Sequence, residues 1–157
     1  MIDRSTGALL VDGARIERET TRTGFRASAL GREAAETDLH TGWWHYFFRR
    51  KVGARDAGVM LHFEAERFDS YRVWDCDPRF GFSSWEDWSE KKLLDQRDAH
   101  DAWLVEMFGP GQRVLVHPGG MEMGGLELTY TFDWGTVAST YDPRSPDCFI
   151  GAHFHRR

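Results

Sequence analysis

Alternating apolar and polar residues predict β-strands in the middle of the chain. Residues 43–50, WWHYFFRR, are dense in aromatic side chains, which favour a pleated and half-buried strand. In residues 59–68, every second residue from Val59 to Ala65 is apolar, so we expect a strand with its other face in water. That wet face comprises His62, Glu64 and Glu66. Residues 70–75 alternate in the same way and predict a further strand.

The hydrophobic period then changes to that of a long amphipathic helix. Residues 83–86 read S-x-x-E, a capping box that starts helices, and Gly109 followed by Pro110 is a stop signal. Between these signals one broad face is apolar and the opposite face is charged. The apolar face comprises Trp85, Trp88, Leu93, Gln96, Ala99, His100, Trp103, Leu104 and Met107, and the charged face comprises Glu90, Lys91, Asp98 and Asp101. We therefore expect a helix over residues 83–108 to be the main element of the core.

Shorter elements are expected on both sides of this helix. Residues 23–28 predict a short strand, and residues 32–36 predict a turn or a brief helix. After the helix, strands are expected at residues 112–117 and 126–132, where β-branched and aromatic residues recur.

The end of the chain and the order of the elements predict the fold class. Residues 136–141 and 148–154 are strand-like runs on either side of a loop with two prolines, so they predict a hairpin. Strands on both sides of a single long helix favour an α+β fold over a parallel sheet. We expect a curved antiparallel sheet packed on one long amphipathic helix, with a C-terminal β-hairpin. A length of 157 residues is typical of a single domain, here residues 1–157.

Composition and charge narrow the function classes. Hydrophobic residues make up 41% of the chain, with seven Trp, eleven Phe and four Tyr, which is enough to build a core. The net charge of −5 disfavours nucleic acid as a partner and fits a basic protein better. The sequence shows neither a secretion signal nor an apolar run of about 20 residues, so we expect a cytoplasmic protein with no membrane partner. Cys76 and Cys148 lack C-x-x-C spacing and are expected to be free thiols.

The histidines do not form a recognisable catalytic or metal site. His153 and His155 share one face of the last strand, but two imidazoles without a third ligand do not make a metal site, so no metal and no other cofactor is expected. His100 precedes Asp101, yet adjacent helix positions point about 100° apart and do not form a dyad. A buried, hydrogen-bonded His100 is the more common arrangement. Because G-x-S-x-G and phosphate-loop motifs are absent from the sequence, we expect no enzyme.

Acidic residues ahead of the predicted helix are candidates for binding a partner. They are Asp75, Asp77, Glu86 and Asp87, with Glu64 and Glu66 as an alternative set. Acids near a helix N-terminus also stabilise the helix dipole, and that structural role is at least as common as docking.

The C-terminal half carries a resemblance to a known family. HDAWL at residues 100–104, FDWGTVAS at 132–139 and YDPR at 141–144 follow one another within roughly the last 70 residues. This succession resembles small bacterial immunity proteins of contact-dependent or type VI-like systems, which neutralise toxins delivered between competing cells. The resemblance implies a protein that binds one cognate toxin domain and holds it inactive, without catalysis.

Two other classes of function stay open. One is a small-molecule-binding or enzymatic α+β domain with a pocket between helix and sheet. The other is a structural subunit of a larger assembly, which would expose a large apolar patch.

Overall fold

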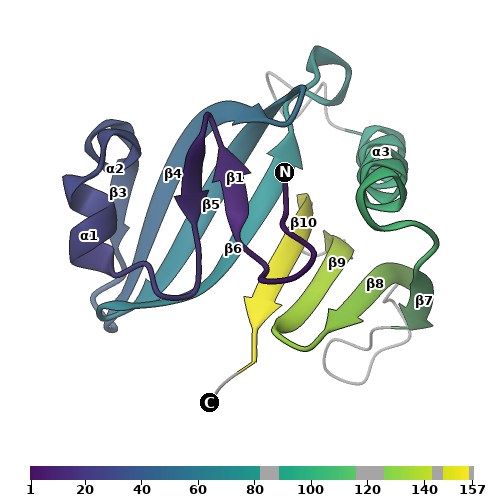
Figure 1. The fold of residues 1–157 in the computed structure, drawn as a ribbon. Helices are drawn as coiled ribbons and strands as arrows, with labels where there is room; N and C mark the ends of the chain where they lie inside the picture. The colour runs from purple at the N-terminus through teal and green to yellow at the C-terminus, as the bar shows by residue number, and fades with distance from the viewer. Residues whose placement is uncertain (82–88, 116–125, 143–146, 156–157) are drawn as a thin grey trace.

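An antiparallel sheet forms the centre of the computed structural model, which describes residues 1–81, 89–115, 126–142 and 147–155 (Figure 1). Within these residues the sheet has eight strands in the order β3-β4-β5-β6-β10-β9-β8-β7. The strands are β3 (Ala35–Asp38), β4 (Trp43–Val52), β5 (Arg55–Glu64), β6 (Arg67–Asp75), β7 (Gln112–Leu115), β8 (Leu126–Phe132), β9 (Gly135–Asp142) and β10 (Asp147–Phe154). A separate hairpin pairs β1 (Leu9–Val11) with β2 (Ala14–Ile16). The helices are α1 (Arg22–Ala27), α2 (Ala29–Glu33), the short 3-10 helix η1 (Pro78–Phe80) and α3 (Glu90–Phe108).

The α+β fold expected from the sequence is confirmed. The 19-residue helix α3 packs on the sheet, against β9, β10 and β6. β9 and β10 form the expected C-terminal hairpin, in which Tyr141 lies opposite Cys148. The strand predicted at residues 112–117 is present as β7, and its last two residues lie outside the described part of the chain.

The core lies on one face of this sheet, which we call the inner face. Alternate residues of the strands point to it, including Tyr46, Leu61, Tyr71 and Ile150, all buried. The β1–β2 hairpin and α1 cover the half built from β4, β5 and β6, and α3 covers the half that contains β9 and β10 (Figure 1). Helix α1 contributes Phe25, whose ring lies 5.1 Å from that of Tyr46.

Helix α3 begins and ends at polar and glycine caps. The Ser89 hydroxyl accepts the Lys92 N–H, and the chain leaves the helix at Gly109 with a φ of 79°. The predicted C-terminal end is therefore confirmed. The prediction of one continuous helix from Ser83 is wrong, because the backbone of Ser89 is extended and α3 begins at Glu90, while the capping box at residues 83–86 lies outside the described residues. The placement of Asp101 on the charged face is wrong: it is buried, and its carboxylate accepts a hydrogen bond from Arg113 of β7 at 2.7 Å. None of the described helices has the length and apolarity needed to span a membrane.

The strand predicted at residues 23–28 is wrong, because residues 23–27 belong to helix α1 and Ser28 is its C-cap. The Thr21 hydroxyl caps the helix by accepting the Gly24 N–H. The Glu66 carboxylate accepts the Thr23 N–H at 2.9 Å from 43 residues further along the chain. Such a long-range cap overrides the weak local preference of TGFRAS for a strand. Residues 32–36 divide between the end of α2 and the start of β3.

The single strand predicted over residues 59–68 is wrong in its length and in its wet face. The chain turns at Ala65, which has a φ of 51°, so that β5 ends at Glu64 and β6 begins at Arg67. His62, expected in water, is 7% exposed, because the ring of His45 on the neighbouring strand packs against it at 4.3 Å between centroids.

Replacing Trp103 tests the contribution of α3 to the core. Its ring is 5% exposed and lies under the Arg55 guanidinium, 5.1 Å from the ring centre. We expect Trp103→Ala to lower the free energy of unfolding by about 3–5 kcal/mol in denaturant melts, because a buried indole leaves a cavity. The control Val105→Ala, at an exposed site on the same helix, should change it by less than about 1 kcal/mol. A loss below about 1 kcal/mol for Trp103→Ala would contradict this packing.

Candidate functional site

The other face of the sheet, which we call the outer face, is a candidate binding surface. Within the described part of the chain, no helix or hairpin packs on it, because α1, α3 and the β1–β2 hairpin all lie on the inner face. Strand register brings outward-pointing residues into rows across the sheet. Phe47 lies opposite Met60, which lies opposite Arg72, and the next row runs from Arg49 through Gly58 to Trp74.

Phe47, Met60 and Trp74 of these rows, together with Phe149 of β10, form what we call the aromatic patch, in which Phe149 is 9% exposed. The ring of Trp74 lies 6.3 Å from that of Phe47 and 6.0 Å from that of Phe149. Phe47 is 38% exposed although it is large and apolar. Aromatic residues and arginine are the types enriched in the centres of protein interfaces.

Polar contacts fix the patch in place. The Trp74 indole N–H donates to the Asp147 carboxylate at 2.9 Å, and Arg72 pairs with the same carboxylate at 3.6 Å. The Arg72 guanidinium also stacks over Phe149, 4.2 Å from the ring centre. These contacts hold two aromatic rings and an arginine in one arrangement before any partner arrives.

The outer face differs between its two halves. The patch spans β4, β5, β6 and β10, whereas the outward positions of β8 and β9 are mostly threonine. These are Thr129, Thr131, Thr136 and Thr140. We call this second region the threonine half.

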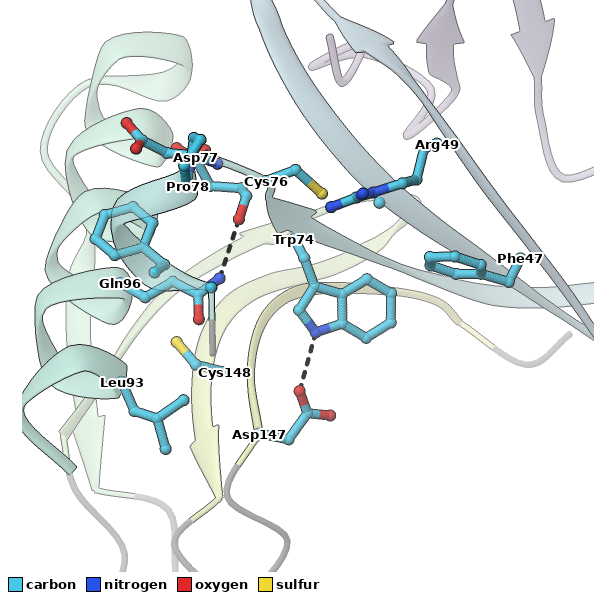
Figure 2. A pocket seen from close by; sticks show the side chains of 14 residues that line it. Phe47, Arg49, Trp74, Cys76, Asp77, Pro78, Leu93, Gln96, Asp147 and Cys148 are labelled. Carbon is cyan, nitrogen blue, oxygen red and sulfur yellow. Dashed lines mark hydrogen bonds between the residues drawn. The ribbon is translucent and has the colours of Figure 1, made fainter. Parts of the chain in front are cut away.

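A pocket adjoins the aromatic patch at the end of β6 and the start of β10 (Figure 2). Its volume is about 880 Å³. Phe47, Arg49 and Trp74 line it from the sheet, and Leu93 and Gln96 of α3 line it from the opposite side. The pocket therefore lies between α3 and residues of the sheet, the position expected for a small-molecule-binding or enzymatic domain.

The pocket exists because β6 and β10 separate. Their pairing stops at Val73 and Ile150, so the next residues of each strand are not paired with each other. The backbone of Asp75 instead bonds to α3: its N–H donates to the His100 Nε2 at 3.0 Å, and its carbonyl accepts from the Gln96 amide at 3.1 Å. Both buried backbone groups thus keep partners, as buried peptide groups require.

His100 also meets Cys148, and the pair is not an activated thiol. The His100 Nδ1 lies 3.4 Å from the Cys148 sulfur. Because Nε2 accepts a backbone N–H, the proton of the neutral ring sits on Nδ1 and faces the sulfur, so the ring has no lone pair there for the thiol proton. Burial lowers the pKa of His100 to about 3 and raises the pKa of the Cys148 thiol. The predicted buried, hydrogen-bonded His100 is confirmed, and both cysteines are free thiols as expected.

Three histidines stand beside the aromatic patch: His45, His62 and His153. Burial is the main cause that lowers the pKa of His45 and of His62, to about 3 for His62. The His62 Nε2 is buried without a hydrogen-bond partner. Among the described residues, no group of three or more His, Cys, Asp or Glu side chains is arranged to hold a metal ion. His153 is exposed, and the ring of His155 donates to the Phe132 carbonyl at 3.2 Å.

The described acids that were predicted to bind a partner are each paired with an arginine. Asp75 is 8% exposed and pairs with Arg55 at 3.3 Å, and Asp77 pairs with Arg79 at 2.8 Å. Both line the pocket. Glu86 and Asp87 lie outside the described residues.

The alternative pair of acids lies at the other end of β6. Glu64 pairs with Arg67, and Glu66 pairs with Arg22 at 3.3 Å. A strand of nine residues spans about 30 Å, so these acids and those of the pocket do not form one contact point. A role of either set in partner binding stays a prediction.

Comparison with known proteins gives a likeness of fold. No family model matches the chain, and no curated protein matches it. A solved structure described as Rhs1-CT in complex with cognate immunity protein RhsI1 contains a chain that superposes with a TM-score of 0.54. The match covers 98% of this chain and 86% of that chain, at 14% sequence identity. At this identity the likeness shows the fold alone.

The resemblance to immunity proteins over the C-terminal half is wrong as a statement of family. No family model supports it, and the structural likeness extends over 98% of the chain. That likeness is to one chain of a complex that holds a toxin and an immunity protein, and it does not assign the chain to either side. The described residues of the short runs quoted for the resemblance belong to α3, to β8 and β9 and to the turn between these two strands.

The two thiols should differ in reactivity. Burial and a raised pKa leave Cys148 almost without thiolate, whereas Cys76 is partly exposed. We expect iodoacetamide to label Cys76 in the native protein at least about 100-fold faster than Cys148, as followed by mass spectrometry. Cys76→Ser should leave only the slow thiol, and urea should make both react. Fast labelling of Cys148 in the native Cys76→Ser variant would show that the thiol is activated.

Acid should destabilise the protein through its buried histidines. The pKa of His62 and of His100 is about 3 in the folded state, against 6.5 when unfolded, so the unfolded state takes up protons first. Stability is therefore lost as the pH falls from 6.5 towards 3, by about 1–2 kcal/mol per histidine between pH 7 and pH 5. His62→Gln should reduce this loss in denaturant melts. An unchanged loss in that variant would argue against a neutral, buried His62.

Proposed function

We propose that this protein is the immunity component of a toxin–immunity pair. It binds one cognate toxin domain and holds it inactive, without catalysis of its own. The observation that carries the proposal is the aromatic patch on the outer face, where Phe47 is 38% exposed and no described helix or hairpin packs on the rings. The class of partner is suggested by the fold, which a chain of a solved toxin–immunity complex shares.

The chemistry of the described residues favours the binding partner over the toxin. General acid–base catalysis works best with groups whose pKa lies near the operating pH. The buried His62 and His100 instead have pKa values of about 3, and the thiol that meets His100 has a raised pKa. The described candidate acids are held in ion pairs with arginines of the same chain. Such groups stabilise a fold and support a role in binding.

The net charge of −5 contributes to this function at long range. Toxins that cleave nucleic acid present a basic cleft to their substrate, and an acidic protein is drawn to such a surface. Attraction of this kind raises the rate of association and weakens as salt increases. It does not require any one acid to lie in the contact, because paired acids add little individually.

The pocket supports a second candidate function, the binding of a small molecule. A cavity of about 880 Å³ with apolar walls and a few polar groups is of the size that holds such ligands. Native mass spectrometry of the purified protein separates the two candidates. A stoichiometric small molecule that raises the melting temperature would favour this second function over the first.

Co-expression tests the immunity function. The toxin domain encoded by the adjacent reading frame is expressed with this protein or with an unrelated protein of similar size. We expect growth to be restored only by this protein, and the two chains to co-purify as a complex whose association slows as salt is raised. Equal killing in both cultures, together with no co-purification, would refute the immunity function.

A further inference from the structure

We infer that the partner docks on the aromatic patch, inserts an apolar side chain into the adjoining pocket, and places a carboxylate against Arg49. This inference rests on the proposed function and names the surface and the chemistry that the function uses. The occupant is the toxin domain, and the contact residues of this chain come from β4, β6 and the start of β10.

The contrast between the two halves of the outer face points to the aromatic patch. Both halves belong to one sheet, and neither is covered by a described helix or hairpin. The threonine half presents short polar side chains that water solvates well, whereas the aromatic patch keeps apolar rings near water. Binding removes that apolar surface from water only in the patch, so the favourable free energy of docking is concentrated there.

The patch is also rigid before binding. Trp74 is held by its hydrogen bond to Asp147, and Phe149 lies beneath the Arg72 guanidinium. Side chains that are already fixed lose little conformational entropy when a partner arrives. The rings therefore suit the role of central contacts, around which less ordered residues form a rim.

The pocket continues the patch and gives the partner a place to insert. Phe47 and Trp74 belong to both, and Leu93 closes the far wall from α3 (Figure 2). An apolar side chain of the partner that enters between Trp74 and Leu93 would be surrounded by apolar atoms. Contact residues with the largest effects on binding are typically those seated in such pockets.

The charge at the rim of the pocket selects a carboxylate. Arg49 is exposed and makes no ion pair within the described residues, whereas the nearby Arg55, Arg72 and Arg79 each pair with an aspartate. An unpaired guanidinium beside an apolar contact favours a bidentate carboxylate from the partner.

Binding of the inactivated toxin domain from the adjacent reading frame to purified variants tests the inference, with Kd measured by calorimetry. We expect Trp74→Ala and Phe47→Ala to raise Kd about 30-fold or more and Arg49→Glu about 10-fold or more. Gly81→Phe should also weaken binding, because Gly81 lines the pocket and a Cβ there meets only the Pro78 carbonyl at 3.5 Å. Phe47 and Arg49 are exposed, so their variants keep the fold, which circular dichroism checks.

Matched controls lie elsewhere on the surface. Arg32→Glu reverses an exposed charge on α2, Val114→Ala trims an exposed apolar residue of β7, and Thr131→Glu places a charge in the threonine half. Each should leave Kd within about 3-fold of the wild type. A partner residue Asp or Glu that contacts Arg49 should, when changed to Arg, restore binding to Arg49→Glu.

The outcomes separate the inference from the proposed function. Wild-type binding that survives the patch, pocket and Arg49 variants overturns the docking surface and leaves the immunity function standing. If only Thr131→Glu or Val114→Ala weakens binding, the partner docks on the part of the sheet built from β7, β8 and β9, and the inference is overturned. No binding by the wild-type protein removes the proposed function, and the docking surface with it.

Discussion

The separation of β6 from β10 is the constraint on which the rest of the structure depends. The strands pair up to Val73 and Ile150, and beyond that point the backbone of Asp75 faces a gap instead of a strand. Side chains of α3 fill this gap, with His100 bonding to the N–H of Asp75 and Gln96 to its carbonyl. Two hydrogen bonds to the same residue fix both the position of the helix along the sheet and its rotation about its own axis. A neutral imidazole is required for this, since a protonated Nε2 cannot accept the N–H.

The same separation links the inner face to the outer face. Trp74 and Phe149 stand immediately beyond the last paired residues, and their rings project outward while the helix enters from within. Asp147 begins β10 and binds both Trp74 and Arg72, so one carboxylate ties together the outward side chains of two diverging strands. The gap between β6 and β10 is the place where side chains of α3 bond to Asp75, and it also forms the pocket. The patch and the pocket therefore both result from the separation of these two strands.

The sequence was sufficient for the elements whose pattern is local. The density of aromatic and β-branched residues predicted β4 and β8, and the stop signal at Gly109 predicted the end of α3. Prediction from the sequence was wrong where a contact with a residue far along the chain determines the local structure. Helix α1 depends on a cap from Glu66. The acidic residues predicted to bind a partner form ion pairs with arginines that lie far from them in the sequence, such as Arg55 with Asp75 and Arg22 with Glu66.

The aromatic patch was missed for a different reason. In β4 both the inward residues Tyr46 and Phe48 and the outward residue Phe47 are aromatic, so the alternation that marks a wet face is hidden. In residues 70–75, alternation puts Trp74 on the face opposite Tyr71 and Val73, but a tryptophan there does not by itself indicate exposure. The structure identifies the patch because α1, α3 and the β1–β2 hairpin all lie on the inner face, so that the outward rings are not covered by them.

The division of the sheet into a face that holds the core and a face that holds none bears on how such proteins diverge. Along each strand, inward residues pack in the core beneath the helices, whereas outward residues contact only their neighbours on the sheet, solvent or another molecule. Changes can therefore accumulate at every second position without opening cavities beneath the helix. The outer surface of such a sheet can change while its backbone stays the same, and a likeness at 14% identity shows that different sequences form this fold.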